Sequence, residues 1–517
     1  MSLSADDIAD IASLIAPGTV SVEPERLARM SMDIFEWAQE RPADLLLAPA
    51  SVEGVSACLA WAGRKGIAIA PRGGGMSYTR GFQPRSERIA LMDLRALDGV
   101  RHFSPENRIV VVEAGCTWNA LENLLKPHGL RPALDGPISG AVSTIGGAVS
   151  QGMPGGMQHI LGLEIVLSDG RVVTTGALAR PGSPGALRSS GPDLTGLFIG
   201  DCGALAIKTA IAIRLSLRPL VAECASFGFA DPVVLAEAIA AVQARNCGVK
   251  VMGLAERNVQ AAAAATSLRE GLALIRRTIV SSGSLTNGLG RAARLALVRG
   301  KGPRPAWGLH LTAEANSPAI ASAMLADAIS AVPSQGVALA PTVPIAMQTR
   351  LYSVRGMLGP GGERWAPVHG IFPLQQIGPA TRAIAEFLES RKARIEQHGI
   401  THSMMFSAQD TNVLVEPMLY WPDSLRPVHA SALRPDLVKR FADNPANEKA
   451  REMARALRLE LRDLLLAQGA MMAQLGQYYP YEDLSEEPAR QLARSIKQLL
   501  DPEVVLNPGN FDWEQGQ

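Results

Sequence analysis

A chain of 517 residues is too long to fold around a single compact core, so two or three domains are expected. Its formal net charge of +1 argues against a general nucleic-acid-binding protein, which needs a strong excess of basic residues. The five cysteines include no C-x-x-C pair, which argues against a disulfide framework or a cysteine metal site and is typical of a reduced, cytoplasmic protein.

The N-terminal stretch, MSLSADDIADIASL, is acidic and amphipathic, and it lacks the basic flank and the apolar block of a signal peptide. No uninterrupted apolar run approaches the ~20 residues that a membrane-spanning helix requires. We therefore expect a cytoplasmic protein without a transmembrane segment.

Apolar runs and helical patterns alternate over the first 220 residues, which predicts an α+β segment. In the run LEIVLSDGRVVTTG, Asp169 and Gly170 suit the tight turn of a β-hairpin. The small residues of STIGGAVSQG (143–152) are expected to form a buried loop. The other expected strands are GIAIAP, RIALMDL and NRIVVVEAG, and the expected helices are SVEGVSACLAWAGRKG and TWNALENLLKPHG.

The sequence pattern changes after Pro219, where alanine-rich helical segments begin, so a second domain is expected there. The predicted strands include AWGLHLTAEA and NVLVEPMLYW. A long helical pattern from about residue 445 leads into QLGQYYPYEDL and the terminal LLDPEVVLNPGNF. The predicted helices before it are 232–245, 255–277, 317–331 and 378–398.

Residues 276–304 contain seven basic and no acidic side chains. We interpret this segment as a solvated or self-paired face, and an acidic partner, membrane headgroups or a redox protein are the alternatives. The basic residues are Arg276, Arg277, Arg291, Arg294, Arg299, Lys301 and Arg304.

Three consecutive glycines stand in PRGGGMSYTRGF, directly after a predicted strand. Because glycine adopts positive φ, successive N–H groups of such a loop can converge into a nest for an anion, and a diphosphate is the natural guest. The alternative is an ordinary turn between a strand and a loop. The nicotinamide fingerprint is absent, because no G-x-G-x-x-G with a downstream acid follows a strand here.

Four blocks in this order resemble the flavoprotein family of vanillyl-alcohol oxidase and p-cresol methylhydroxylase, which also includes the flavin-linked D-lactate and glycolate dehydrogenases. The blocks are PRGGGMSYTRGF, GPISGAVSTIGGAVSQG, SSGPDLTGLFIGDCGALAIKTAIAIRL and LDPEVVLNPGNF. They cover the first 220 residues and the last 50, whereas the middle of the chain resembles the variable cap of the family only loosely.

The resemblance implies an α+β fold with a p-cresol-methylhydroxylase-type FAD-binding domain of two α+β subdomains in residues 1–220. An α+β cap, or substrate domain, is expected in residues 221–460. Residues 461–517 are expected to return to the FAD domain.

By match to the family, the first glycine loop would hold the pyrophosphate of FAD through backbone N–H groups. The second loop would line the diphosphate and the isoalloxazine ring, Ile207 would contact the flavin or the adenosine, and the C-terminal return would lie at the ring. The implied cofactor residues are Pro71, Arg72, Gly73, Gly74, Gly75, Met76, Ser77, Ser143, Thr144, Gly146, Gly147, Ser150, Gly152, Ile207 and Asn507.

Met76 stands where several family members carry the histidine that bonds covalently to the flavin. A thioether cannot form that bond, so FAD is predicted to be noncovalent, with a cap histidine such as His369 as the exception. The flavin-linked 2-hydroxy acid dehydrogenases have a histidine-rich metal motif and a Gly-Glu-His-Gly-Ile-Gly stretch late in the chain. Neither is intact here, and EQHGIT resembles the second only weakly. No metal site is predicted.

Oxidation of a substrate by flavin needs a group that takes or polarises the hydroxyl proton. The irregular stretch LYSVRGMLGPGGERWAPVHGIFP offers Arg355 and His369 as candidates. Arg355 is alternatively part of a surface ion pair, and His369 is alternatively a structural histidine. In VEPMLYWPD, Glu416 is either a base or a solvated side chain. In QLGQYYPYED, Tyr478 and Tyr479 are either proton-handling groups or packing aromatics.

The resemblance implies an FAD-dependent oxidoreductase that transfers a hydride from a small organic alcohol, an aromatic compound or a 2-hydroxy acid to flavin N5. The alternatives are a para-phenol or benzylic-alcohol oxidase of the vanillyl-alcohol oxidase type and, outside the enzymes, a flavin-binding electron-transfer subunit. Oxygen, a cytochrome and a quinone stay open as electron acceptors, and a homo-oligomer stays open as the assembly.

Overall fold

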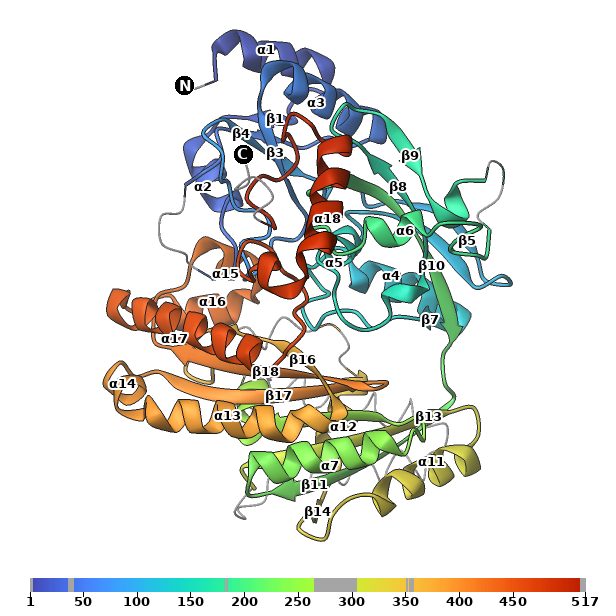
Figure 1. The fold of residues 1–517 in the computed structure, drawn as a ribbon, viewed down its shortest axis with the longest axis vertical. Helices are drawn as coiled ribbons and strands as arrows, with labels where there is room; N and C mark the ends of the chain where they lie inside the picture. Colours follow the sequence, from blue (N-terminus) through green and yellow to red (C-terminus); the bar gives the residue numbers. More distant parts are fainter. Residues whose placement is uncertain are drawn as a thin grey trace. The chain divides into compact units, whose positions relative to one another are not determined.

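The computed structural model describes residues 3–35, 41–180, 182, 185–264, 305–349, 352 and 358–511. Its contacts divide the chain into two units (Figure 1). The first unit consists of Met1–Arg218, Arg426–Ala432 and Met472–Gln517, and the second consists of Pro219–Leu425 and Leu433–Met471. The basic segment 276–304 and Arg355 lie outside the described residues.

The first unit begins with a four-stranded sheet in which two of the three strand pairings are parallel. Helix α3 (Val52–Lys65) connects two of its strands; Ser51 caps the helix and Gly66, at φ 60°, ends it. The strand order is β1 (Val20–Ser21), β2 (Leu45–Leu47), β4 (Ile89–Asp93) and β3 (Ala68–Arg72).

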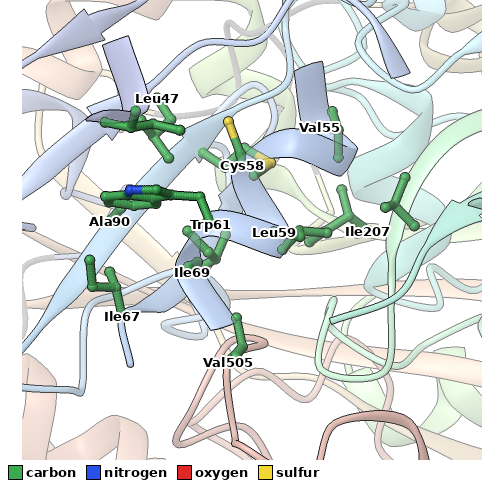
Figure 2. Close-up of a cluster of buried hydrophobic side chains, with 14 of the residues drawn as sticks. Leu47, Val55, Cys58, Leu59, Trp61, Ile67, Ile69, Ala90, Ile207 and Val505 are labelled. Carbon is green, nitrogen blue, oxygen red and sulfur yellow. The ribbon is translucent and has the colours of Figure 1, made fainter. Parts of the chain in front are cut away.

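The buried side of α3 anchors this part of the unit (Figure 2). Trp61 is fully buried against residues of the sheet. The same cluster of buried hydrophobic side chains includes Ile207 from a later strand and Val505 from the C-terminal segment. Burial of a large aromatic and aliphatic side chains is the main source of stability in such a cluster. The cofactor residue Ile207 predicted from the sequence is therefore also a core residue.

The second sheet of the first unit is antiparallel, and its central strand is β10 (Ile207–Leu217). The hairpin predicted at Asp169 and Gly170 is confirmed: the Gly170 N–H donates to the Leu167 carbonyl, and Gly170 has a φ of 89°. The order is β5 (Val100–Ser104), β6 (Ile109–Glu113), β10, β8 (Ile160–Val166) and β9 (Val172–Thr174), and β7 (Leu130–Pro132) also pairs with β10.

One element of this unit differs from the expectation, because residues 145–150 form a short helix, α5 (Ile145–Ser150), instead of a loop. Thr144 caps the helix through its side chain, and Ile145 and Val149 are fully buried one turn apart. The remaining helices of the unit are α1 (Ala5–Leu14), α2 (Pro24–Met30), α4 (Trp118–Leu125), α6 (Leu194–Leu197), α15 (Pro427–Ala432) and α18 (Glu487–Leu500).

The second unit is built on an eight-stranded antiparallel sheet. The strand order is β14 (Val337–Leu339), β11 (Val221–Phe229), β13 (Trp307–Ala315), β12 (Lys250–Ala255), β17 (Thr401–Gln409), β18 (Asn412–Trp421) and β15 (Arg364–Pro367), and β16 (Gly370–Pro373) also pairs with β18. The helices are α7 (Pro232–Ala244), α8 (Glu256–Ala264), α11 (Pro318–Ser330), α12 (Thr342–Thr349), α13 (Ile377–Ser390), α14 (Lys392–Gln397), α16 (Pro435–Phe441) and α17 (Glu448–Ala467).

The two faces of this sheet differ in chemistry. Helix α7 covers the apolar face, where Leu309 and Phe406 are fully buried (Figure 1). Because side chains alternate along a strand, Glu416 and its cross-strand neighbour Met405 point to the opposite face. That face also carries Ser226 and His310, whose Oγ and Nδ1 are 2.9 Å apart, so polar groups gather there.

No helix within the described ranges is long and apolar enough to cross a bilayer. All five cysteines are free thiols. In the part of the chain that the structure describes, no three His, Cys, Asp or Glu side chains gather as metal ligands.

Candidate functional site

The first glycine loop follows β3 and lies directly against the second small-residue loop. A Cβ on Gly73 would overlap the Thr144 hydroxyl, and a Cβ on Gly74 would overlap the Val142 carbonyl oxygen and lie 2.8 Å from its carbon. Two glycines are therefore required by the close approach of another part of the same chain. A third, Gly75, has a φ of 73°, a conformation that glycine adopts without strain.

Arg72 places a buried positive charge at the start of this loop. Its side chain is 5% exposed, its Nη1 donates to the Gly73 carbonyl at 3.1 Å, and its Nε has no hydrogen-bond partner. Burial, and then the neighbouring Arg95, lower the pKa of Arg72 to about 10, so the guanidinium stays charged at neutral pH. The nearby Asp93 carboxylate is already paired with Arg95 at 2.7 Å.

A buried guanidinium with an unpartnered N–H, next to a glycine loop, fits an anion such as the diphosphate of FAD. Arg72 is in addition placed over the ring of Phe82, 5.4 Å from its centroid, which fixes the direction of the side chain. Arg72 and the backbone of residues 73–77 are thus the groups that would hold the diphosphate.

The second loop is held by close packing on both sides. The Thr144 hydroxyl accepts a hydrogen bond from the Gly147 N–H at 3.2 Å, and a Cβ on Gly146 would lie 2.6 Å from the Cβ of Ala114. Further along, a Cβ on Gly152 would lie 2.9 Å from the Cα of Gly200. The structure therefore brings the predicted cofactor residues of this loop together with those of the first loop, at Gly73 and Thr144. Ser143 lies in the sequence between Val142 and Thr144, which both contact the first loop, and its hydroxyl is 2.6 Å from that of Ser139. The Ser150 carbonyl accepts a hydrogen bond from the Cys202 N–H at 2.7 Å.

The C-terminal segment joins the same region by adding backbone hydrogen bonds along β3. The Ile69 N–H donates to the Val505 carbonyl at 2.7 Å, and the Asn507 N–H donates to the Ile69 carbonyl at 2.8 Å. The Asn507 side chain is 1% exposed, and its Nδ2 donates to the carbonyls of Gly81 and Cys202. Its Oδ1 is buried without a hydrogen-bond partner, which leaves an acceptor for a ligand donor.

Two buried ion pairs that sequence reasoning missed hold this region in place. Lys208 pairs with Asp201, and both side chains are 1% exposed. Lys497 pairs with Asp501 at 2.5 Å and also donates to the carbonyls of Ala204 and Leu506. Burial lowers the pKa of Lys208, and the Asp201 carboxylate opposes this effect. A lysine inside the apolar run ALAIKTAIAI was the available signal for the first pair.

The segment with the candidate tyrosines packs against both glycine loops. The Gln474 N–H donates to the Gln151 carbonyl at 3.0 Å, and the Gln477 N–H donates to the Thr79 carbonyl at 2.9 Å. Tyr478 and Tyr479 are 3% and 2% exposed, and their rings meet edge to face with centroids 4.7 Å apart. Both rings are buried in the first unit, and a proton-handling role for them stays a prediction.

The cap candidates lie in the second unit. His369 is 1% exposed and directly precedes β16. Glu416 is 8% exposed on β18, and burial raises the pKa of its carboxyl to about 7. A carboxyl with such a pKa is half ionised at neutral pH and can accept a proton there.

Comparison with known proteins gives a family match within the first unit. Residues 43–176 match the family model described as an FAD binding domain. The chain is 29% identical over 221 residues to a mitochondrial D-2-hydroxyglutarate dehydrogenase of Danio rerio, which covers 41% of this chain and 40% of that protein. The chain thus aligns with about two fifths of the length of this relative. It is 26% identical over 478 residues to the D-lactate dehydrogenase of Archaeoglobus fulgidus, which covers 90% of each chain.

Solved structures of similar fold cover nearly the whole chain. p-Cresol methylhydroxylase with substrate bound aligns with a TM-score of 0.73 at 16% identity, over 98% of this chain and 96% of that one. 4-Ethylphenol oxidase from Gulosibacter chungangensis aligns with a TM-score of 0.69 at 16% identity, over 98% of each chain. The expected α+β architecture is confirmed. Taken with the glycine loops and Arg72, these matches show an FAD binding domain in residues 43–176, with FAD as its cofactor, and a fold similar to that of p-cresol methylhydroxylase over nearly the whole chain.

Proposed function

We propose that this protein oxidises a 2-hydroxy acid, with FAD as the cofactor and Glu416 as the proton acceptor. The observation that carries the proposal is the Glu416 carboxyl, which is buried on the polar face of the second unit's sheet and has a pKa of about 7. The similarity to a D-lactate dehydrogenase over 90% of both chains supports this substrate class.

The chemistry removes a hydride from the carbinol carbon and a proton from its hydroxyl oxygen. Bound FAD supplies the acceptor for the hydride that leaves the C–H bond. The ionised Glu416 takes the proton of the hydroxyl group, so that the C–O single bond becomes the carbonyl of a 2-oxo acid. A buried base suits this role because its carboxylate is poorly solvated and therefore a stronger proton acceptor.

We expect D-lactate, D-2-hydroxyglutarate or a related 2-hydroxy acid to bleach the flavin of the purified protein under anaerobic conditions. Absorbance of the oxidised flavin is followed after each addition, with p-cresol and vanillyl alcohol as controls for phenol oxidation. Bleaching by the phenols alone would move the protein to the para-phenol oxidases. Bleaching by no compound of either set would contradict the proposed oxidation and favour an electron-transfer subunit.

FAD is expected to be bound without a covalent bond, because Met76 offers only a thioether at the predicted attachment position. Precipitation of the protein with acid should therefore release the yellow colour into the supernatant. The measurement compares flavin absorbance in the supernatant and in the washed pellet. Colour retained by the pellet would contradict this expectation and direct attention to His369, which mass spectrometry of flavin peptides would test.

A further inference from the structure

Two consecutive residues of α8 contact side chains of β18 on the face that also carries Glu416. The Asn258 Nδ2 donates to the Met418 sulfur at 3.7 Å, and the Arg257 guanidinium lies over the Tyr420 ring, 5.1 Å from its centroid. Because side chains alternate along β18, residues 416, 418 and 420 share one face. We name Arg257, Asn258, Glu416, Met418 and Tyr420 the β18 cluster.

The β18 cluster contains two acceptors that the protein leaves without a donor. A thioether sulfur is an acceptor, so the Asn258 amide turns its N–H toward Met418, and its buried Oδ1 has no hydrogen-bond partner. No hydrogen bond or ion pair of the Glu416 carboxyl is found within the described ranges. A buried acceptor without a donor costs about 1–3 kcal/mol, so the Asn258 Oδ1 points to a ligand that supplies the donor.

The cluster also contains an unused donor. The Arg257 Nη2 donates to Glu363 at 3.3 Å, whereas its Nε is buried without a hydrogen-bond partner. An arginine N–H is a suitable donor to a carboxylate. The cluster thus offers one positively charged donor and two acceptors.

We propose that the β18 cluster selects a 2,3-dihydroxy acid. The inference rests on the proposed oxidation of a 2-hydroxy acid and narrows its substrate. The 2-hydroxyl donates to Glu416, the 3-hydroxyl donates to the Asn258 Oδ1, and the carboxylate accepts from the Arg257 Nε. A methyl group in place of the hydroxymethyl group leaves Asn258 unsatisfied, and a second carboxylate brings a negative charge to an acceptor.

Glycerate and lactate form a matched pair for the test, because they differ only in the hydroxyl at C3. The rate of anaerobic flavin reduction is measured for both enantiomers of each acid as a function of concentration. We expect kcat/KM for the preferred glycerate to exceed that for lactate by roughly tenfold, the scale of one hydrogen bond to a buried group.

Asn258→Leu removes the acceptor at similar volume and should bring the ratio of glycerate to lactate close to one, mainly by raising KM for glycerate. Gln260→Leu is the matched control, because Gln260 is an exposed amide on the same helix whose Nε2 donates to Glu256 at 3.3 Å. This control should keep the ratio of the wild-type protein. Titration with hydroxypyruvate and pyruvate, followed by flavin absorbance, gives the same comparison without turnover.

A wild-type preference for lactate or 2-hydroxyglutarate over glycerate overturns the inference and leaves the oxidation of 2-hydroxy acids in place. An unchanged ratio in Asn258→Leu overturns it in the same way. If no 2-hydroxy acid reduces the flavin, the proposed function fails and the inference fails with it.

Discussion

Gly74→Ala is expected to purify as a largely colourless protein. The added Cβ would overlap the Val142 carbonyl oxygen and lie 2.8 Å from the carbonyl carbon, and neither backbone atom can move like the end of a flexible side chain. The first glycine loop must therefore shift away from the second, which displaces the backbone N–H groups beside Arg72. Overpacking of this kind costs about 1–3 kcal/mol, so FAD should bind roughly 5- to 150-fold more weakly.

Gly63→Ala is the matched control, because this glycine lies inside α3 and an added Cβ would find its nearest atom, the Ser168 carbonyl oxygen, at 3.8 Å. It should keep the full flavin content and be slightly more stable. The ratio of flavin to protein absorbance and the FAD dissociation constant are measured for both variants. Full flavin content in Gly74→Ala at unchanged affinity would show that the packing of the two loops does not shape the cofactor site.

The elements of the first unit could be predicted from local sequence where turn chemistry and hydrophobic pattern agreed. Asp169-Gly170 produced the expected hairpin, and the helical pattern of SVEGVSACLAWAGRKG predicted α3. The sequence STIGGAVSQG favours a loop, because two of its residues inside α5 are glycines, which have low helix propensity. The structure has a helix there instead. Its helix α5 is stabilised by the Thr144 cap and by burial of Ile145 and Val149, and burial depends on parts of the chain far away in sequence.

The glycines of the first loop illustrate what sequence alone leaves open. Their spacing predicts that something approaches the backbone closely, and a diphosphate is a sound expectation for it. The structure adds a second cause, because the Val142 backbone and the Thr144 hydroxyl occupy the space that side chains at Gly73 and Gly74 would need. A contact between segments some seventy residues apart leaves no local pattern that could reveal it.

The same limit applies to the charged residues. Arg72, Glu416 and Asn507 can be selected from the sequence, but their burial and the unpartnered atoms of Arg72 and Asn507 follow from tertiary structure. Lys208 was overlooked because a lone lysine in a strand gives no sign of its partner Asp201, seven residues earlier across a turn. Ion pairs formed by folding can be recognised only after the fold is known.

Glu416→Gln is expected to lower kcat for substrate oxidation by roughly 10²- to 10⁴-fold, the scale of one general base, while FAD stays bound. The carboxylate must be ionised to take the hydroxyl proton, so kcat/KM of the wild-type protein should rise with pH and level off above a pKa of about 7. Stopped-flow reduction between pH 5 and 9 measures both effects. Glu223→Gln is the control, because Glu223 lies on β11 of the same sheet and accepts from Ser322 at 2.8 Å; it should react at the wild-type rate.

The stability of the same variant provides the decisive second readout. Burial raises the pKa of Glu416 from its ordinary value of 4.5 to about 7, so the folded state favours the neutral carboxyl. Its contribution to stability is present below pH 4.5 and is lost as the pH rises to about 7, where ionisation costs on the order of 3 kcal/mol. Gln cannot ionise, so Glu416→Gln should unfold at a similar temperature to the wild type at pH 4.5 and at a higher temperature at pH 8. A variant that is slow and yet more stable at pH 8 identifies a buried group retained for chemistry, whereas wild-type rates would move the proton acceptor to His369, Tyr478 or Tyr479.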